Sequence, residues 1–446
     1  MNRYPVLALA VLVAIPFSGL PAAAQPVLTL TDALAAALRD SDEVAAASAA
    51  ASEATERVSQ ASAGYLPRID FAQSWQRGDQ PVFVFGSLLA QRQFTAADFG
   101  LTQLNTPNPI TNGRTAFYAE QLIFDGGRTR AGARAAARGA DIAQQGQRQV
   151  RNDLSLAVTR AYGAVLRAAA AGAAAQSAVA AAEEDARTAE ARRDAGTGTE
   201  ADVLSLRVHL AEMRARAIDA ASGVRIARAE LNRSMREPLE REFAVVEPAI
   251  IESPPEPVGP LMERALRDRP EISVADLQIA VSQALRDGAR SALLPQVAAQ
   301  AGYEWNDGSR GSPASAWIAG ATIRMNVFAG GGNLARVHES THGLARARLE
   351  RDRIAGTVRA EVLTATEQLA SARARHDVGR SAVAHARESQ RMIRDRHEAG
   401  LAPAGDVIRA ATAALDAEVQ RIGAVVDVIV AEAALRRAIG TEGTTP

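Results

Sequence analysis

The 446-residue sequence contains no cysteine and no lysine. The lack of cysteine excludes disulfides, thiolate metal sites, a thiol nucleophile and a lipid attached to cysteine, so any attachment to a membrane is expected to be non-covalent. All 50 basic residues are arginine, which we interpret as a coding bias of the genome. They nearly balance the 51 acidic residues and no long block of one sign occurs, so nucleic acid is not an expected partner.

Long apolar runs are also missing after the N-terminal segment. The alanine-rich stretch 168–182 is broken by Gly172, Gln176 and Ser177. No run reaches the roughly 18 residues that mark a membrane-spanning helix. A helical membrane span is therefore not expected.

Residues 1–24 have the pattern of a cleavable secretory signal. They carry Arg3 near the start, an apolar run from Val6 to Phe17, and three alanines before Gln25. The apolar run is too short for a membrane span and is followed by a small-residue cleavage site. The mature protein is therefore expected to be exported.

Proline is absent from two long stretches, 127–194 and 333–398. Each predicts one uninterrupted helix of about 100 Å at 1.5 Å per residue, a length that no globular domain needs. Both carry a narrow apolar stripe with spacings of 4, 3 and 4 residues, which is typical of coiled-coil packing. The stripe residues are Leu154, Val158, Ala161 and Val165 in the first stretch, and Val358, Val362, Ala365 and Leu369 in the second.

The two long stretches belong to a repeated sequence. The matching segments are 37–40 with 265–268, 66–67 with 294–295, 124–127 with 328–331, and 195–203 with 399–407. The first two pairs are 228 positions apart and the last two are 204 positions apart. A register held over such long blocks predicts an internal duplication. The length change lies between Leu66 and Phe124, so one of two equivalent loops is enlarged.

Each repeat is predicted to contain an opening helical segment, a β-hairpin, a very long helix, a tip turn and a return helix. The first repeat, 25–236, has its hairpin at 66–124, long helix at 127–194, tip turn at 195–202 and return helix at 203–236. The second repeat, 261–440, has them at 295–328, 333–398, 399–406 and 407–440. A proline-rich strap, 237–260, joins the repeats, and a short tail, 441–446, follows the second.

Alternating side chains predict the strands. Val297, Ala299, Ala301, Tyr303 and Trp305 fall on one side of the second hairpin's first strand, with polar residues between them. Strands of about ten residues that are apolar outside and polar inside are typical of an outer-membrane barrel, although a soluble two-layer sheet has the same period. The smallest membrane barrels have about eight strands, and a membrane tolerates no open sheet edge. Four strands in a membrane would therefore require self-association.

Several short motifs, taken in order and spacing, carry a family resemblance. They are Leu-Thr-Leu-Thr-Asp-Ala-Leu at 28–34, Tyr-Leu-Pro at 65–67, Phe-Asp-Gly-Gly at 124–127, and the two related turns at 193–204 and 396–408. The whole mature chain resembles the TolC-type outer-membrane efflux protein family. The resemblance implies an α+β membrane protein, a homotrimer with four strands per protomer. These form a twelve-stranded β-barrel, continued into the periplasm by a long α-helical coiled-coil barrel.

The resemblance also implies a function and partners. The expected role is that of a passive exit duct in the outer membrane for a tripartite efflux or type I secretion system. Its partners would be outer-membrane lipid, a periplasmic adaptor and an inner-membrane pump of the RND or ABC type. The enlarged loop, around Gln80 to Asn112, would then face the cell exterior. The transported substrate does not follow from the sequence.

In the resembled family the tunnel closes at its periplasmic tip, and six residues here take that place by the resemblance. Gly196 is followed six residues later by Asp202, and Gly400 by Asp406. This chain has Arg409 where some members carry a further acidic residue, and His397 where they carry an aromatic residue. From the residues alone, stabilisation of helix N-termini is the favoured role of both aspartates, and a left-handed turn is that of both glycines.

Other functions are less well supported by the sequence. His338 and His342 are four apart on one helical face, but two ligands without a third make a weak metal site. No phosphate-cradling loop or nucleophile elbow occurs, so neither enzyme activity nor a cofactor is expected. The alternatives are a periplasmic adaptor and a soluble coiled-coil scaffold. Both leave the alternating, aromatic strands unexplained.

Overall fold

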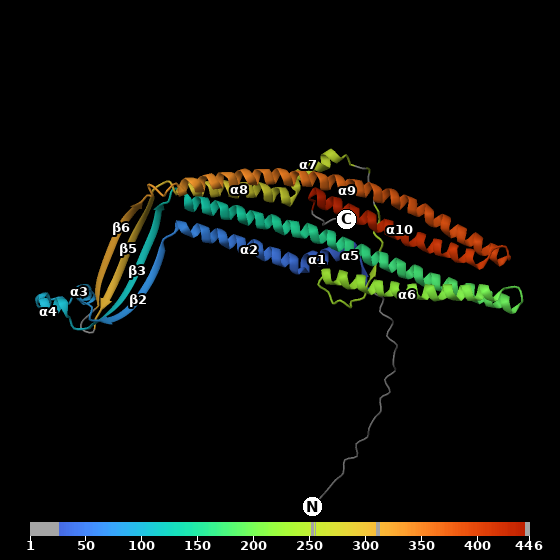
Figure 1. Ribbon diagram of the computed structural model, residues 1–446, viewed down its shortest axis with the longest axis horizontal. Coiled ribbons are helices and arrows are strands. Elements are labelled where there is room, and N and C mark those ends of the chain that lie inside the picture. The colour runs from blue at the N-terminus through green and yellow to red at the C-terminus, as the bar shows by residue number, and fades with distance from the viewer. Residues whose placement is uncertain (1–25, 251–253, 255, 309–312, 442–446) are drawn as a thin grey trace, which may run out of the picture.

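The computed structural model describes residues 26–250, 254, 256–308 and 313–441. The predicted signal at 1–24, and the tail after residue 441, lie outside them. Figure 1 shows a curved sheet at one end of a long bundle of helices. The outer end of the sheet carries the small helices α3 and α4. At the opposite end of the bundle, one tight turn joins α5 to α6 and another joins α9 to α10.

The elements follow one another in the order helix, strand, strand and long helix twice along the chain. In the first half they are β1 (Val27–Leu28), α1 (Leu30–Asp40), α2 (Asp42–Ser62), η1 (Ala63–Tyr65), β2 (Arg68–Gly78), α3 (Pro81–Ala90), η2 (Ala96–Phe99), α4 (Leu101–Asn105), β3 (Ile110–Phe124), α5 (Arg128–Asp194) and α6 (Glu200–Ser234). In the second they are β4 (Ala244–Val245), α7 (Val258–Asp268), α8 (Pro270–Ser291), β5 (Gln296–Asp307), β6 (Ala314–Arg324), α9 (Gly332–Glu398) and α10 (Ala404–Ile439).

The two hairpins form one four-stranded antiparallel sheet in the order β2-β3-β5-β6. Its apolar face carries a row of aromatic residues in register, namely Phe71, Phe117, Tyr303 and Trp317. Its polar face carries, among others, a row made of Arg68, Glu120 and Gln300. A bulge between Leu122 and Phe124 shifts the register at the end of β3 and pairs Phe124 with Val297 on the apolar face, so the alternation in the sequence changes phase at that point.

The enlarged connection between β2 and β3 was expected to be a loop but contains two short α-helices and a 3-10 turn. Phe85 and Phe94 have ring centroids 4.8 Å apart, and Phe94 and Phe99 5.1 Å apart, both in edge-on geometry. Pro81 lies in the first turn of α3, where proline favours helix initiation. Length comparison of the repeats locates such an insertion but says nothing of how it packs.

The predicted apolar stripes of α5 and α9 are buried, but their partners are mainly the short outer helices. Val158 and Tyr162 of α5 pack with Ala33 of α1, Leu231 of α6 and Phe243 of the strap. In the other half, Val358 and Val362 of α9 pack with residues of α7, α8 and α10. The stripes therefore hold the shorter elements against the long helices, namely α1, α6 and the strap on α5 and α7, α8 and α10 on α9.

Close approach of helices depends on small residues. A Cβ placed on Gly163 of α5 would lie 2.6 Å from Cγ1 of Val426 in α10, so a larger residue there would push the two helices apart. One described helix, α5, is apolar enough over one stretch of 18 residues to cross a membrane by composition alone. Because α5 also packs against α2, α6, α8 and α10, we assign it to the bundle.

Within its described residues, the strap predicted at 237–260 contains β4, and its last three residues already belong to α7, which begins at Val258. Its β4 pairs in parallel with β1 at the start of the chain. The Tyr162 hydroxyl lies 3.0 Å from the carbonyl oxygen of Leu28 and 2.8 Å from that of Val246, and it accepts from the Val246 amide at 3.1 Å. Burial, the larger influence, raises the pKa of Tyr162 although the Val246 amide lowers it, so the hydroxyl stays protonated as a donor.

Candidate functional site at the helical tip

Both long helices end in the same glycine-dependent turn. Gly196 and Gly400 have φ of 72° and 75°, a left-handed conformation that other residues adopt only with strain. The amide of Thr197 donates 2.9 Å to the carbonyl of Arg192, and that of Leu401 donates 2.8 Å to that of Arg396. These bonds make each turn a Schellman motif.

Asp202 lies in the first turn of α6, which begins at Glu200 and not at residue 203 as predicted. Its backbone amide donates 3.2 Å to the Thr199 hydroxyl oxygen, and that hydroxyl donates 2.7 Å to its carboxylate. Thr199 is thus the capping residue, and Asp202 accepts from it while placing negative charge at the helix N-terminus. Of the two ways in which an aspartate can stabilise a helix N-terminus, Asp202 therefore uses its charge, while Thr199 supplies the cap.

Asp406 takes the equivalent place in α10, which begins at Ala404. Its amide donates 3.0 Å to the carbonyl of Pro403. Its carboxylate forms an ion pair with Arg409, three residues on in the same helix. Within the described protomer Arg409 therefore offsets the charge of Asp406 and does not join the two hairpins.

His397 holds the second turn. Its Nδ1 lies 2.7 Å from the carbonyl oxygen of Ala402, a contact that requires the proton on Nδ1. This bond closes the turn between α9 and α10. His397 thus acts by hydrogen bonding where an aromatic residue would act by packing.

Arg192 links the two hairpins, and the sequence did not single it out. Its Nη1 donates 2.9 Å to the carbonyl oxygen of His397, and its Nη2 donates 2.9 Å to that of Glu398. These carbonyls end α9, where no further turn of helix supplies donors and the helix dipole is negative; that of His397 also accepts from the Gly400 amide at 3.0 Å. The contact spans 205 positions, so no local pattern marks it.

An apolar cluster and an ion pair support this junction. Ala186, Ala189, Val203 and Leu206 of the first hairpin are buried together with Ala404 of the second. Further from the tip, Arg394 of α9 lies 3.5 Å from Asp185 of α5. The two hairpins are therefore joined by a small apolar contact between polar links.

A groove of about 290 Å³ lies between the hairpins beyond this junction, lined by residues that include His209, Met213, Arg387 and Glu418. Burial lowers the pKa of His209 below its ordinary value, against the weaker opposing effect of Glu212 and Asp185. The imidazole is therefore uncharged at neutral pH.

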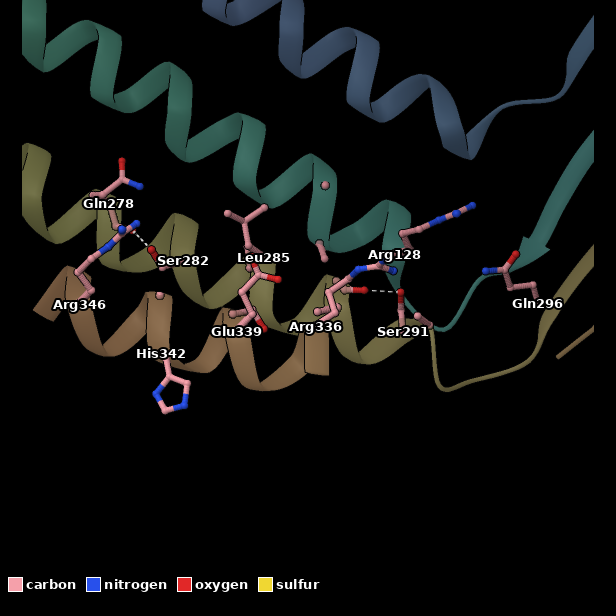
Figure 2. Close-up of a pocket in the computed structure, with 18 residues that line it drawn as sticks. Arg128, Gln278, Ser282, Leu285, Ser291, Gln296, Arg336, Glu339, His342 and Arg346 are labelled. Carbon is pink, nitrogen blue, oxygen red and sulfur yellow. Dashed lines mark hydrogen bonds between the residues drawn. The ribbon is translucent and has the colours of Figure 1, made fainter. Parts of the chain in front are cut away.

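A larger groove of about 940 Å³ lies between α5, α8 and α9 near the sheet (Figure 2). His342 belongs to its rim, but Figure 2 shows its imidazole pointing away from α5 and α8. Among the residues that the structure describes, no three His, Cys, Asp or Glu side chains gather in a way that could hold a metal ion. His338 and His342 thus gain no third ligand from the described part of the chain.

The sequence matches the family described as "Outer membrane efflux protein" over residues 33–235 and 261–441. The chain belongs to this family. It is an outer-membrane protein that extends into the periplasm, and its relatives are exit channels for efflux.

Relatives are distant in sequence and close in fold. The curated outer membrane efflux protein BepC of Brucella suis is 24% identical over 425 residues, which cover 92% of this chain and 85% of BepC. The CmeC outer membrane channel of Campylobacter jejuni is 15% identical with a TM-score of 0.79, covering 94% of this chain and 87% of CmeC. The MtrE channel of Neisseria gonorrhoeae, solved in an open state, is 18% identical with a TM-score of 0.74, covering 94% of this chain and 91% of MtrE.

Proposed function

We propose that three copies of this chain close one twelve-stranded barrel in the outer membrane and a helical tunnel below it. The two outer edges of the sheet carry this proposal. Within the described residues, β2 pairs only with β3 and β6 only with β5, so each leaves one row of backbone groups without a partner. A membrane tolerates no such edge. Pairing of β6 with β2 of the next copy satisfies both edges.

The exposed apolar face supports a lipid environment. Trp75 and Trp317 are 73% and 75% exposed on this face, and Ile69 and Ile323 are similarly open. The polar face instead carries an Arg114–Glu304 hydrogen bond of 2.7 Å. In a barrel the first face contacts lipid and the second lines a water-filled lumen. An adaptor or a soluble scaffold would leave the tryptophans in water.

The tunnel then serves as a passive duct in a tripartite efflux or type I secretion system. Helices α5 and α9 are 67 residues each, about 100 Å at 1.5 Å per residue, which suits a path from the outer membrane into the periplasm. We assign the supply of energy to an inner-membrane pump of the RND or ABC type. A periplasmic adaptor would join that pump to the helical tip.

The tip is the gate in this proposal. Three copies would bring Asp202 and Asp406 around one axis, and rings of carboxylates attract cations. Since Arg409 already pairs with Asp406, Asp202 would supply most of the free negative charge. His397, Gly196 and Gly400 shape the turns that carry these side chains.

Single-channel recording tests the charge of the gate. Wild-type channels in planar bilayers are expected to show low conductance, cation preference and block by multivalent cations added at the periplasmic side. Replacing both Asp202 and Asp406 by Asn should raise the half-blocking concentration about tenfold or more, equivalent to about 1.4 kcal/mol.

Arg409→Ala should strengthen block without raising conductance, because the ion pair of Arg409 with Asp406 lies within one helix.

Asparagine is chosen because it removes the charge but keeps a side-chain oxygen that can accept the Thr199 hydroxyl hydrogen bond at position 202, so the helix loses only a charge–dipole contribution of about 0.3 to 1 kcal/mol per site. Trimer content on a gel should therefore match wild type. Unchanged cation block in correctly assembled Asp202→Asn/Asp406→Asn trimers would mean that these carboxylates only stabilise helix ends and that the gate lies elsewhere.

A further inference from the structure

The segment between β2 and β3, residues 79–109, forms a small folded unit that we call the cap. It contains α3, η2 and α4 and lies at the far end of the strands from the long helices (Figure 1). The half-buried Phe85 and Phe94 form an edge-on pair within it, and Phe99, which is largely exposed, packs edge-on against Phe94 from the surface. A connection that served only to join two strands would need neither helices nor such aromatic packing.

The cap is fastened to the polar face of the sheet. The Gln91 amide nitrogen donates 2.9 Å to the carbonyl of Thr111 and 2.9 Å to the side-chain oxygen of Asn112. Asn112 in turn donates 3.2 Å to the side-chain oxygen of Asn306 on β5. Gln91 is only 5% exposed, so this network is buried and its geometry is constrained.

The burial of strand residues also shows that the cap covers the polar face of the sheet. At the outer end of the sheet, Asn112, Asn306 and Ala314 are buried, and all three belong to the polar face by strand register. On the opposite face at this end, Trp75 is 73% exposed. Next to Gln91, the Arg92 guanidinium donates 2.9 Å to the carbonyl of Ser315 on β6. The cap therefore bends over the polar side of the sheet.

In the proposed barrel the polar face lines the lumen, so each cap would project into the extracellular mouth. The surface of the cap is unusually apolar for a water-filled mouth. Four large apolar side chains of the cap are strongly exposed: Val82 at 80%, Leu89 at 51%, Phe99 at 66% and Leu101 at 78%. A water-filled mouth gives these side chains no apolar partner unless other caps supply one.

We propose that the three caps meet at the barrel axis through these apolar side chains and narrow the extracellular mouth. The occupant of each cap's apolar surface is a second copy of this chain, and the contact continues the interface in which β6 meets β2. An apolar constriction obstructs ions by excluding water. It would form a second closure in series with the charged one at the tip. This inference rests on the proposed trimer.

Cysteine cross-linking tests the contact directly, because the natural chain contains no cysteine. Val82→Cys and Leu101→Cys, each alone in the full-length protein, should give covalent dimers within the trimer when outer membranes are oxidised with copper phenanthroline. Thr102→Cys is the matched control, since it is an exposed polar neighbour of Leu101 in α4 and points to a different side of the helix. It should cross-link far less.

Trimers that give no covalent dimer from either Val82→Cys or Leu101→Cys would overturn the inference alone. Absence of trimers by native mass spectrometry would overturn the proposed assembly and this inference with it. Equal cross-linking of all three variants would also overturn it, because random cap motion would explain that result.

Conductance gives a second readout. Resistances in series mean that the outer constriction limits current only when the tip is open. The test therefore uses channels that also carry Arg192→Ala, which removes the two hydrogen bonds between the tip hairpins and is expected to open the tip; a rise in conductance from Arg192→Ala alone verifies this first. In that background, Val82→Ser/Leu101→Ser should raise conductance at least twofold by admitting water. Unchanged conductance in assembled trimers would show that the caps do not restrict the mouth.

Discussion

Ala301→Arg is expected to abolish trimer assembly, whereas Gln300→Arg, one residue away, is expected to be nearly neutral. Ala301 pairs with Ala119 and Ala319 on the apolar face. Arginine near the middle of a lipid-facing strand costs about 2 to 4 kcal/mol per protomer. Gln300 pairs with Glu120 on the polar face, where a new arginine meets water and an opposite charge.

The measurement is the amount of heat-dissociable trimer in outer-membrane fractions on a semi-native gel. Ala301→Leu serves as the control for side-chain size, because it enlarges the residue without adding charge. Equal loss of trimer from Ala301→Arg and Gln300→Arg would contradict the assignment of the two faces. So would intact Ala301→Arg trimers.

Arg192→Ala is expected to raise the conductance of reconstituted channels by about tenfold. The substitution removes two hydrogen bonds from the guanidinium to the end of α9, and hydrogen bonds to charged groups contribute about 1.5 to 3 kcal/mol each. These groups lie partly in water, so we expect a smaller net effect, about 1.4 kcal/mol in total for opening of the channel, which is tenfold in the opening equilibrium. The hairpins should then separate more often.

Arg193→Ala is the matched control for this experiment. Arg193 is the adjacent residue of the same helix, but its side chain contacts Asp194 and Glu200, both in its own hairpin. It should change conductance little. If Arg193→Ala opened the channel as much as Arg192→Ala, the effect would come from altered charge at the tip and not from the lost link between hairpins.

Features governed by local periodicity could be predicted from the sequence. The absence of proline and the 4, 3, 4 stripes predicted helices that the structure places at Arg128–Asp194 and Gly332–Glu398. The alternation at Ala301 and Gln300 predicted their opposite faces. In each case the pattern reports the conformation of its own segment, and neighbouring residues carry all the information that is needed.

Contacts between distant segments could not be predicted. Arg192 looks like any basic residue in the last turn of a helix, and its partners are backbone carbonyls, which leave no trace in side-chain identity. Gln91 joins Asn112 through an insertion that has no counterpart in the other repeat. For Asp202, the sequence allowed both capping and pore lining. The structure shows that Thr199 caps the N-terminus of α6, and pore lining by Asp202 stays a prediction.

Closure of the barrel by neighbouring copies is the central claim, and hydrogen–deuterium exchange on the intact oligomer in lipid nanodiscs tests it most directly. In an open sheet about half of the amides in each edge strand lack a backbone partner. In the closed barrel, amides of β2 (Arg68–Gly78) and β6 (Ala314–Arg324) should be protected as strongly as those of β3 and β5. Intact oligomers in which β2 and β6 exchange orders of magnitude faster than the two inner strands would contradict it.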